Sequence, residues 1–297
     1  RLVPDRVVYL DNHATTRVDP RVVEAMRPYW TEKYGNAASV SHAYGEEAAD
    51  AVETARAQIA ELLNATPRNL IFTSGATEAN NLAIKGVIQA VGSSVHLIVN
   101  EAEHRAVLDP ARKLKRLGCE LTVLPVDKYG MVDPQSVAAA IQPNTALVSV
   151  MFANNEVGTI NPVAEIGEIC HERGVLFHCD AAQAVGKLPV DLADLPIDLL
   201  SLTAHKMYGP MGVGALYVRG GDKRIPIEPL FDGGGHERRL RSGTLPVPLI
   251  VGFGEACKLA AEVMRDESKR VQQLRDRLWG GLSEAVEGVY LNGHPDL

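Results

Sequence analysis

Lys206 is the residue whose surroundings in the sequence point most directly to chemistry. It follows an apolar run at 197–202 that predicts a buried strand, and a second apolar run resumes at Ala215. Thr203 and His205 flank the lysine, and glycines that admit a ligand separate the two runs. A desolvated lysine loses its proton readily and acts as an amine nucleophile, which is how a Schiff base forms. An isolated loop lysine is more often a solvated charge, so the other motifs must decide.

Residues 74–78, Ser-Gly-Ala-Thr-Glu, are a candidate phosphate site. They follow an apolar run that predicts a buried strand, and they open a helix. The free N–H groups and the dipole of a helix N-terminus bind an anion well. Taken alone, the motif is better explained as an ordinary helix cap by Ser74 or Thr77. It is neither a P-loop nor a dinucleotide fingerprint, because no GxGxxG occurs here.

Asp180 follows the apolar run at 175–179 and so lies at the end of a predicted buried strand. A carboxylate in such a place is costly unless it faces a cation. A protonated pyridine nitrogen is such a cation, and the carboxylate keeps the ring protonated as an electron sink. Gln183, three residues on, can donate to a phenolic oxygen of the same ring. Without Lys206, a plain helix cap by Asp180 would explain the residue equally well.

His104 and Asn155 are weaker candidates. His104 lies at a strand-to-helix junction, where it either stacks on a flat ring and moves protons or simply caps the helix. Asn155 lies just past a strand, where a turn asparagine is the default. Arg238, Arg239 and Arg241 are either a solvated charge run or part of a loop that reaches a phosphate or a neighbouring subunit.

Together these features specify one cofactor. An amine nucleophile, a phosphate cradle, a carboxylate for a pyridinium and a stacking imidazole combine to predict pyridoxal phosphate. No metal site is predicted, because the four cysteines form no CxxC or other metal-ligand pattern.

The elements that must position these residues alternate along the chain. Strands are predicted at 69–73, 95–100, 120–124, 146–152, 175–179, 197–202 and 215–218, with helices at 77–88, 104–117, 134–141 and 163–173. This alternation predicts an α/β fold whose mostly parallel sheet is covered by helices on both faces. Ligands bind beyond the carboxyl ends of such strands, and almost all the candidates follow a strand.

The two ends of the chain predict a second, smaller domain. A strand is expected at 6–10, helices at 19–30 and 45–64, and a long helix from Pro246 or Pro248 towards Leu282. A further strand begins at Val289, close to the last residue, so we expect this smaller α/β domain to be incomplete. The predicted large, cofactor-binding domain spans 16–257, and the small one comprises 1–15 and 258–297.

Composition narrows the classes of partner. The 297 residues are 46% hydrophobic and 23% charged, with a net charge of −7 that argues against nucleic acid or an anionic membrane as the main partner. No apolar stretch is long enough to span a membrane. The scattered cysteines fit a reducing compartment, so a cytoplasmic location is expected.

Seven motifs, taken in order, resemble the cysteine desulfurases of the iron–sulfur-cluster-assembly branch, over essentially the whole chain. They are Ala14-Thr-Thr16, Ser74-Gly-Ala-Thr-Glu78, His104-Arg-Ala-Val107, Asn154-Asn-Glu-Val-Gly158, Asp180-Ala-Ala-Gln183 with Gly186-Lys187, Thr203-Ala-His-Lys206 with Gly209-Pro210, and Glu237-Arg-Arg-Leu-Arg-Ser-Gly-Thr244. The resemblance implies a pyridoxal-phosphate-dependent transferase of fold type I, which is aspartate aminotransferase-like, and a homodimer. It also implies conversion of L-cysteine to L-alanine, with the sulfur left as an enzyme persulfide for a sulfur-acceptor or scaffold protein of cluster assembly or thiolation.

The resemblance also implies a role for each matching residue. Lys206 would bind the cofactor's aldehyde, Asp180 its pyridine nitrogen and Gln183 its phenolic oxygen. His104 would stack on the ring and move protons, and Asn155 would lie near the phenolic oxygen and the substrate. The phosphate would be held by Ala76, Thr77, Thr203, His205 and, from the other subunit, Thr244.

Two family features are expected outside these 297 residues: the persulfide cysteine and the arginine that holds the substrate carboxylate. The four cysteines present are expected to be small buried hydrophobes, and Cys179 should face away from Asp180 because strand neighbours point to opposite faces. His13 either tunes substrate contacts or is a plain loop histidine. Two alternatives remain open: another pyridoxal-phosphate lyase or transaminase that needs no thiol, and an inactive partner that dimerises or scaffolds an assembly.

Overall fold

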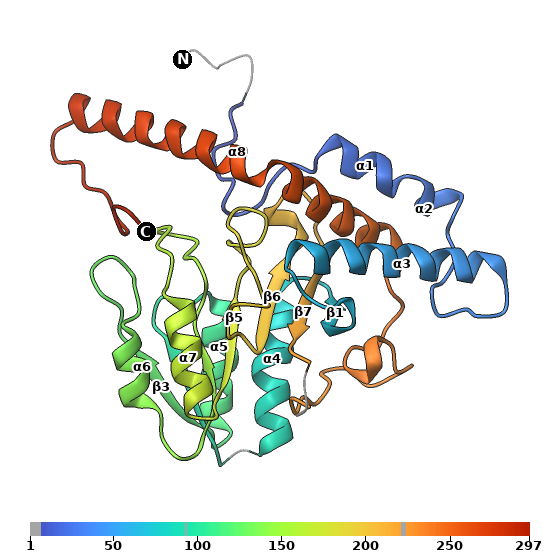
Figure 1. The fold of residues 1–297 in the computed structure, drawn as a ribbon, viewed down its shortest axis with the longest axis horizontal. Helices are drawn as coiled ribbons and strands as arrows, with labels where there is room; N and C mark the ends of the chain where they lie inside the picture. The colour runs from blue at the N-terminus through green and yellow to red at the C-terminus, as the bar shows by residue number, and fades with distance from the viewer. Residues whose placement is uncertain (1–6, 93, 221–223) are drawn as a thin grey trace.

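A seven-stranded sheet forms the centre of the molecule (Figure 1). The computed structural model describes residues 7–92, 94–220 and 224–297. Within them the strand order is β1-β7-β6-β5-β4-β2-β3. The strands are β1 Leu70–Thr73, β2 His96–Asn100, β3 Glu120–Leu124, β4 Thr145–Ser149, β5 Leu176–Asp180, β6 Leu199–Thr203 and β7 Gly214–Val218. Strand β7 pairs antiparallel with β1 and β6, and the other pairs are parallel. The predicted mostly parallel sheet is confirmed.

Helices cover both faces of this sheet because strand side chains alternate between two cores. In β1, Leu70 and Phe72 belong to one apolar cluster and Ile71 to the other. Helices α4 (Ala76–Val91) and α5 (Arg105–Arg116) cover the Ile71 face. The opposite face is covered by α3 (Ala43–Leu62), α6 (Pro134–Ala140), α7 (Val163–Glu172) and the first part of α8 (Val247–Ala285). Each of these helices lies close to its predicted position.

The terminal strands are where the sequence analysis was wrong. Residues 7–10 of the strand predicted at 6–10 form no strand and are exposed, and Arg6 lies outside the described residues. The strand predicted from Val289 is also absent from the described structure. An apolar run becomes a strand only when a neighbour takes up its backbone hydrogen bonds, and neither run has one here. The helix predicted at 19–30 is divided into α1 (Pro20–Met26) and α2 (Pro28–Thr31), because Pro28 interrupts it.

Helix α8 crosses the expected domain boundary without a break. Its first part packs on α3 and α1, whereas most side chains beyond residue 260 are exposed. Figure 1 shows the red end of α8 projecting beyond the sheet. The division at residue 257 therefore stays a prediction.

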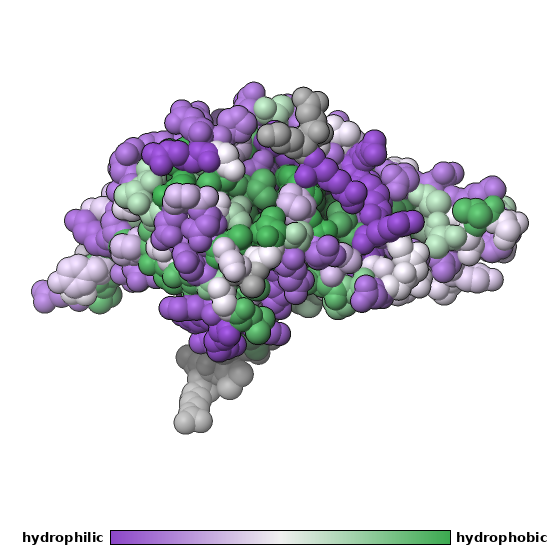
Figure 2. All heavy atoms as spheres, turned by 90° about the horizontal axis from the view of Figure 1, so that it is seen from below, coloured by the Kyte–Doolittle hydropathy of each residue, from purple (hydrophilic) through white to green (hydrophobic). Residues whose placement is uncertain are grey.

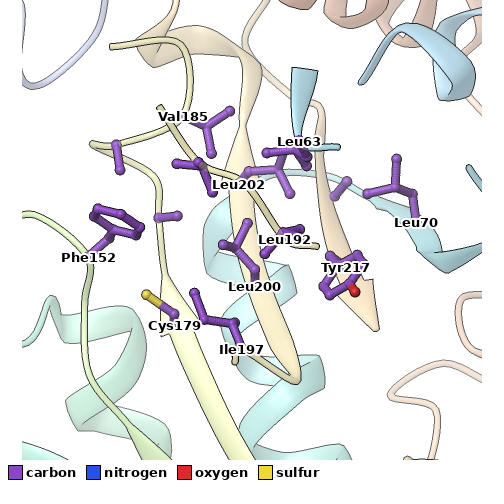
Figure 3. Packing of buried hydrophobic residues seen from close by; sticks show 14 of the residues in the cluster. Leu63, Leu70, Phe152, Cys179, Val185, Leu192, Ile197, Leu200, Leu202 and Tyr217 are labelled. Atoms are coloured by element: carbon purple, nitrogen blue, oxygen red, sulfur yellow. The ribbon is translucent and has the colours of Figure 1, made fainter. Parts of the chain in front are cut away.

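All four cysteines are buried, as predicted. Figure 3 shows Cys179 among the apolar side chains of the larger core cluster, together with Phe152 and Ile197. Burial raises the pKa of the Cys170 thiol to about 12, and burial also raises the pKa of Cys179 and Cys257. These thiols are therefore core side chains, not reactive ones.

The surface is mixed in character. Figure 2 shows hydrophilic residues over most of one face, with apolar residues visible between them near its centre. Among the described residues, no helix combines the length and the apolar character that crossing a membrane requires.

A buried ion pair holds the Gly- and Arg-rich loop to the sheet. The Arg56 guanidinium contacts the Glu237 carboxylate at 2.8 Å, with side chains 9% and 3% exposed, and Glu237 also accepts the Phe72 N–H at 2.7 Å.

Within this loop, Glu237, Arg238 and Arg239 adopt left-handed backbone conformations, so tertiary contacts outweigh local preference there. Arg238 donates to the Leu70 carbonyl, and Arg241 pairs with Glu78 in α4. The interpretation of these arginines as a solvated charge run is wrong for Arg241, whose side chain is only 18% exposed, whereas Arg238 and Arg239 are exposed.

We expect Glu237→Ala to lower the free energy of unfolding by about 3–5 kcal/mol, because it removes the buried partner of the Arg56 charge and leaves only the exposed Glu53 carboxylate beside it. Glu53→Ala is the matched control, since Glu53 also pairs with Arg56 but is 66% exposed; its cost should stay within about 1 kcal/mol. Urea unfolding followed by circular dichroism measures both. Equal costs for the two variants would contradict the dominance of the buried pair.

Candidate active site

A cavity of about 510 Å³ lies beyond the carboxyl ends of the parallel strands. A volume of this size suits a small-molecule ligand. Nine of the ten residues singled out in the sequence line it, and only Thr244 does not. The nine are Ala76, Thr77, His104, Asn155, Asp180, Gln183, Thr203, His205 and Lys206. Tertiary structure therefore gathers side chains that are spread over 130 residues of sequence.

Lys206 ends the short helix η2 (Ala204–Lys206), which connects β6 to β7. Burial lowers the pKa of its amine, while the carboxylates of Asp180 and Glu156 act in the opposite direction. Lowering the pKa enlarges the fraction of neutral amine, which is the nucleophilic form.

The segment before α1 fixes the Lys206 loop, a function that the sequence analysis missed. The Thr16 N–H and hydroxyl both donate to the His205 carbonyl, at 2.9 and 2.8 Å, and the Tyr208 N–H donates to the Thr16 hydroxyl at 2.8 Å. The Thr15 hydroxyl lies 3.1 Å from Nδ1 of His205. The two threonines appeared only as part of a family motif, because contacts across 190 residues leave no local pattern.

Asp180 presents a buried carboxylate at the end of β5. Its Oδ2 accepts from the Asn80 side chain at 2.7 Å, and its Oδ1 accepts from the Ala182 N–H at 3.0 Å. No described cation forms an ion pair with it, so its charge is available to the cavity. Asn80 also lines the cavity, and its Oδ1 is buried without a partner in the described structure. Sequence reasoning missed Asn80, because an asparagine inside a helix carries no signal by itself.

A second carboxyl group, on Glu103, is buried beside His104. Its Oε1 accepts from the Met151 N–H at 2.6 Å and from the Asn100 side chain. Burial, and then repulsion from Asp180, raise the pKa of Glu103 well above its usual value. The protonated form of Glu103 is therefore favoured.

The N-terminus of α4 is an anion cradle. Gly75 is its N-cap, with a left-handed φ of 148°, and no side chain caps the helix. Capping by Ser74 or Thr77 is therefore wrong. No described hydrogen bond takes up the N–H groups of Ala76 and Thr77, while the Glu78 side chain turns back to accept the Ser74 N–H. The cradle remains open to a ligand with negative charge.

His104, Asn155 and Gln183 surround the rest of the cavity. His104 does cap α5, since its Nδ1 accepts from the Ala106 N–H at 3.0 Å, and it also lines the cavity. Asn155 donates to the side chain of Glu156 at 2.9 Å. His104 can therefore cap the helix and still face a ligand in the cavity, so its two predicted roles do not exclude each other.

Thr244 lies exposed at the end of its loop, outside the cavity of its own chain. Its expected contact with a phosphate in another subunit stays a prediction.

The cavity fits pyridoxal phosphate. The open α4 N-terminus suits its phosphate, the Lys206 amine its aldehyde, and the unpaired Asp180 carboxylate a protonated pyridine nitrogen. These three groups line one cavity.

Comparison with known proteins gives consistent relatives. The aminotransferase class-V family matches residues 8–296. The chain is 51% identical over 292 residues to a cysteine desulfurase of Pongo abelii, covering 98% of this chain and 64% of that protein. It is 54% identical over 288 residues to the cysteine desulfurase IscS of Dechloromonas aromatica (strain RCB), covering 96% of this chain and 71% of the relative.

Solved structures agree. A NifS-like protein superposes with a TM-score of 0.90 at 42% identity, covering 94% of this chain and 76% of that one. A structure described as SspA in complex with cysteine gives a TM-score of 0.82 at 42% identity, covering 85% of this chain and 72% of that one. The chain spans 64% of the length of the Pongo abelii relative. This chain belongs to the class-V aminotransferase family, and the relatives named above include cysteine desulfurases.

Proposed function

We propose that the protein is a pyridoxal-phosphate-dependent cysteine desulfurase, a transferase that converts L-cysteine to L-alanine and passes the sulfur to a thiol. The observation that carries this proposal is the cavity in which the Lys206 amine, the Asp180 carboxylate and the open N-terminus of α4 meet. The named cysteine desulfurase relatives and the cysteine complex of SspA support the choice of substrate.

Different residues of the cavity bind different parts of the cofactor. Pyridoxal phosphate, when bound, supplies an aldehyde for an amine and a ring that accepts electrons as a proton leaves the substrate. Asp180 holds a proton on the ring nitrogen, and Gln183 donates to the phenolic oxygen. Ala76 and Thr77 give backbone N–H groups to the phosphate, with Thr203 and His205 beside them.

The same residues move protons at the substrate. Lys206 is half-buried with a lowered pKa, so its Nζ is suited to accept the Cα proton of the substrate. His104 lies at the rim as an exposed imidazole and moves a second proton on the substrate side. The Asn155 carboxamide binds beside the phenolic oxygen and the substrate.

The sulfur needs a thiol acceptor. In the net reaction the substrate C–S bond breaks, an S–S bond forms to the acceptor, and Cβ gains a proton. All four cysteines of the chain are buried, and none lines the cavity. We therefore assign the acceptor thiol to protein outside these 297 residues, where the family resemblance also places the arginine for the substrate carboxylate.

The wider context is also a proposal. The IscS names of bacterial relatives favour iron–sulfur cluster assembly as the pathway, with a sulfur-acceptor or scaffold protein as partner. A homodimer would supply Thr244 to the phosphate of its partner subunit. A cytoplasmic location remains part of this proposal.

Lys206→Ala should abolish covalent capture of pyridoxal phosphate and lower turnover about a thousandfold or more, as removal of a nucleophile does. Borohydride reduction followed by peptide mass spectrometry should locate the cofactor on Lys206 in the unmodified protein. The control is Lys258→Ala, an exposed lysine on α8. Cofactor fixed on another lysine would refute the assignment.

Asp180→Asn should retain cofactor but lower alanine formation by about 100-fold or more, because a neutral amide does not keep the ring nitrogen protonated. Asp133→Asn, at the exposed N-cap of α6, is the matched control and should leave alanine formation unchanged. Assays of alanine, pyruvate and protein-bound persulfide should be run together. Pyruvate, or alanine without persulfide on any supplied thiol, would favour a different pyridoxal-phosphate reaction.

A further inference from the structure

The side-chain amide of Gln183 has two partners that permit only one orientation. Its Nε2 donates to the backbone carbonyl of His13 at 2.9 Å, and its Oε1 accepts from Nζ of Lys187 at 2.7 Å. A carbonyl only accepts hydrogen bonds and an ammonium group only donates them. The flipped amide would oppose two acceptors at one end and two donors at the other. The NH2 group is therefore fixed on the His13 side.

This orientation leaves one hydrogen of Nε2 without a partner among the described residues. An amide nitrogen carries two hydrogens, and the His13 carbonyl takes one of them. Gln183 lines the cavity, so the other hydrogen is available to a ligand there. A flipped amide would instead offer an oxygen, which repels the phenolic oxygen of the cofactor.

We propose that Lys187 is a positioning residue of the active site, which locks the Gln183 amide so that it presents a donor and not an acceptor to the cofactor. The inference rests on the proposed function, since the benefit of the lock lies in cofactor binding. Lys187 has no role in the mechanism described above, and it does not line the active-site cavity of about 510 Å³.

Lys187 is itself held from two sides. Gly186 adopts a left-handed φ of 79°, and a Cβ there would lie 2.8 Å from the Met207 side chain, next to Lys206. Only glycine allows this turn to pack so closely on the Lys206 loop. From α8, the Ser268 hydroxyl donates to the Lys187 carbonyl at 2.7 Å. The lysine is thus placed by the packing of three segments.

The charge of Lys187 is compatible with this role. Burial, with a contribution from Lys206, lowers the pKa of Lys187 to about 8. At neutral pH the group is still mainly an ammonium, which donates and cannot accept. The direction of its hydrogen bond to Gln183 is therefore unambiguous.

A double-mutant cycle on the purified protein with pyridoxal phosphate tests the lock. Lys187→Met and Gln183→Leu should each weaken cofactor binding by about fivefold, the value of one hydrogen bond. Both should also shift, in the same direction, the pH midpoint of the absorbance change of bound cofactor. The double variant should have the same cofactor affinity and the same pH midpoint as Gln183→Leu alone. Lys187→Arg keeps an obligate donor and should restore the midpoint, and Lys115→Met is the exposed control.

Two outcomes would overturn the lock. The first is an effect of Lys187→Met that persists in the Gln183→Leu background, which would mean that the lysine acts through its charge. The second is a Lys187→Met protein with unaltered affinity and midpoint.

A cofactor-free measurement separates this inference from the proposed function. In the apo protein, hydrogen exchange of the ¹⁵N-labelled Gln183 side-chain amide should accelerate in Lys187→Met, and be restored in Lys187→Arg. Unchanged exchange would refute the lock even if pyridoxal phosphate binds. Absence of cofactor binding in the unmodified protein would refute the proposed function alone.

Discussion

The parallel pairing of β2, β4, β5 and β6 is the constraint on which the rest of the structure depends. Parallel strands end at the same edge of a sheet, so the residues that follow them meet there. Asp180 ends β5, Lys206 lies three residues beyond β6, and His104 follows β2. Strand β7 pairs antiparallel with β6, so the chain returns to the sheet at Gly214, and the connection that carries Lys206 spans only residues 204–213.

Charge in the cavity is controlled by burial and pairing. Glu103 and Asp180 are both buried carboxyl groups with different hydrogen-bond partners, and burial together with repulsion from Asp180 raises the pKa of Glu103. Lys206 loses proton affinity through burial and keeps part of it through Asp180. The site thus combines a buried aspartate at the end of β5 with a lysine whose pKa is lowered, which is the combination that amine and proton chemistry on a pyridine ring requires.

Much of this arrangement follows from local patterns. The alternation of apolar strands and amphipathic helices predicted the sheet and its two helical layers, and each central strand was predicted within a few residues of its position. The errors in strand prediction lie at residues 7–10 and near Val289, where apolar runs have no neighbouring strand in the described structure. Strand formation depends on a partner, and the sequence of one run does not contain that information.

The sequence by itself predicted the residues proposed to carry the chemistry. Lys206, Asp180, Gln183, His104 and the 74–78 turn are ambiguous one by one, and it is their combination after successive strands that indicates a single site. Only the tertiary structure decided how these residues are held. Thr16 fixes the Lys206 loop, Asn80 holds Asp180, and Lys187 orients Gln183. Thr16 and Asn80 each lie 100 or more positions in sequence from the residue that they contact. All three contacts are side-chain hydrogen bonds whose direction is set by packing. Residue type is a local property, whereas orientation is a property of the assembled core.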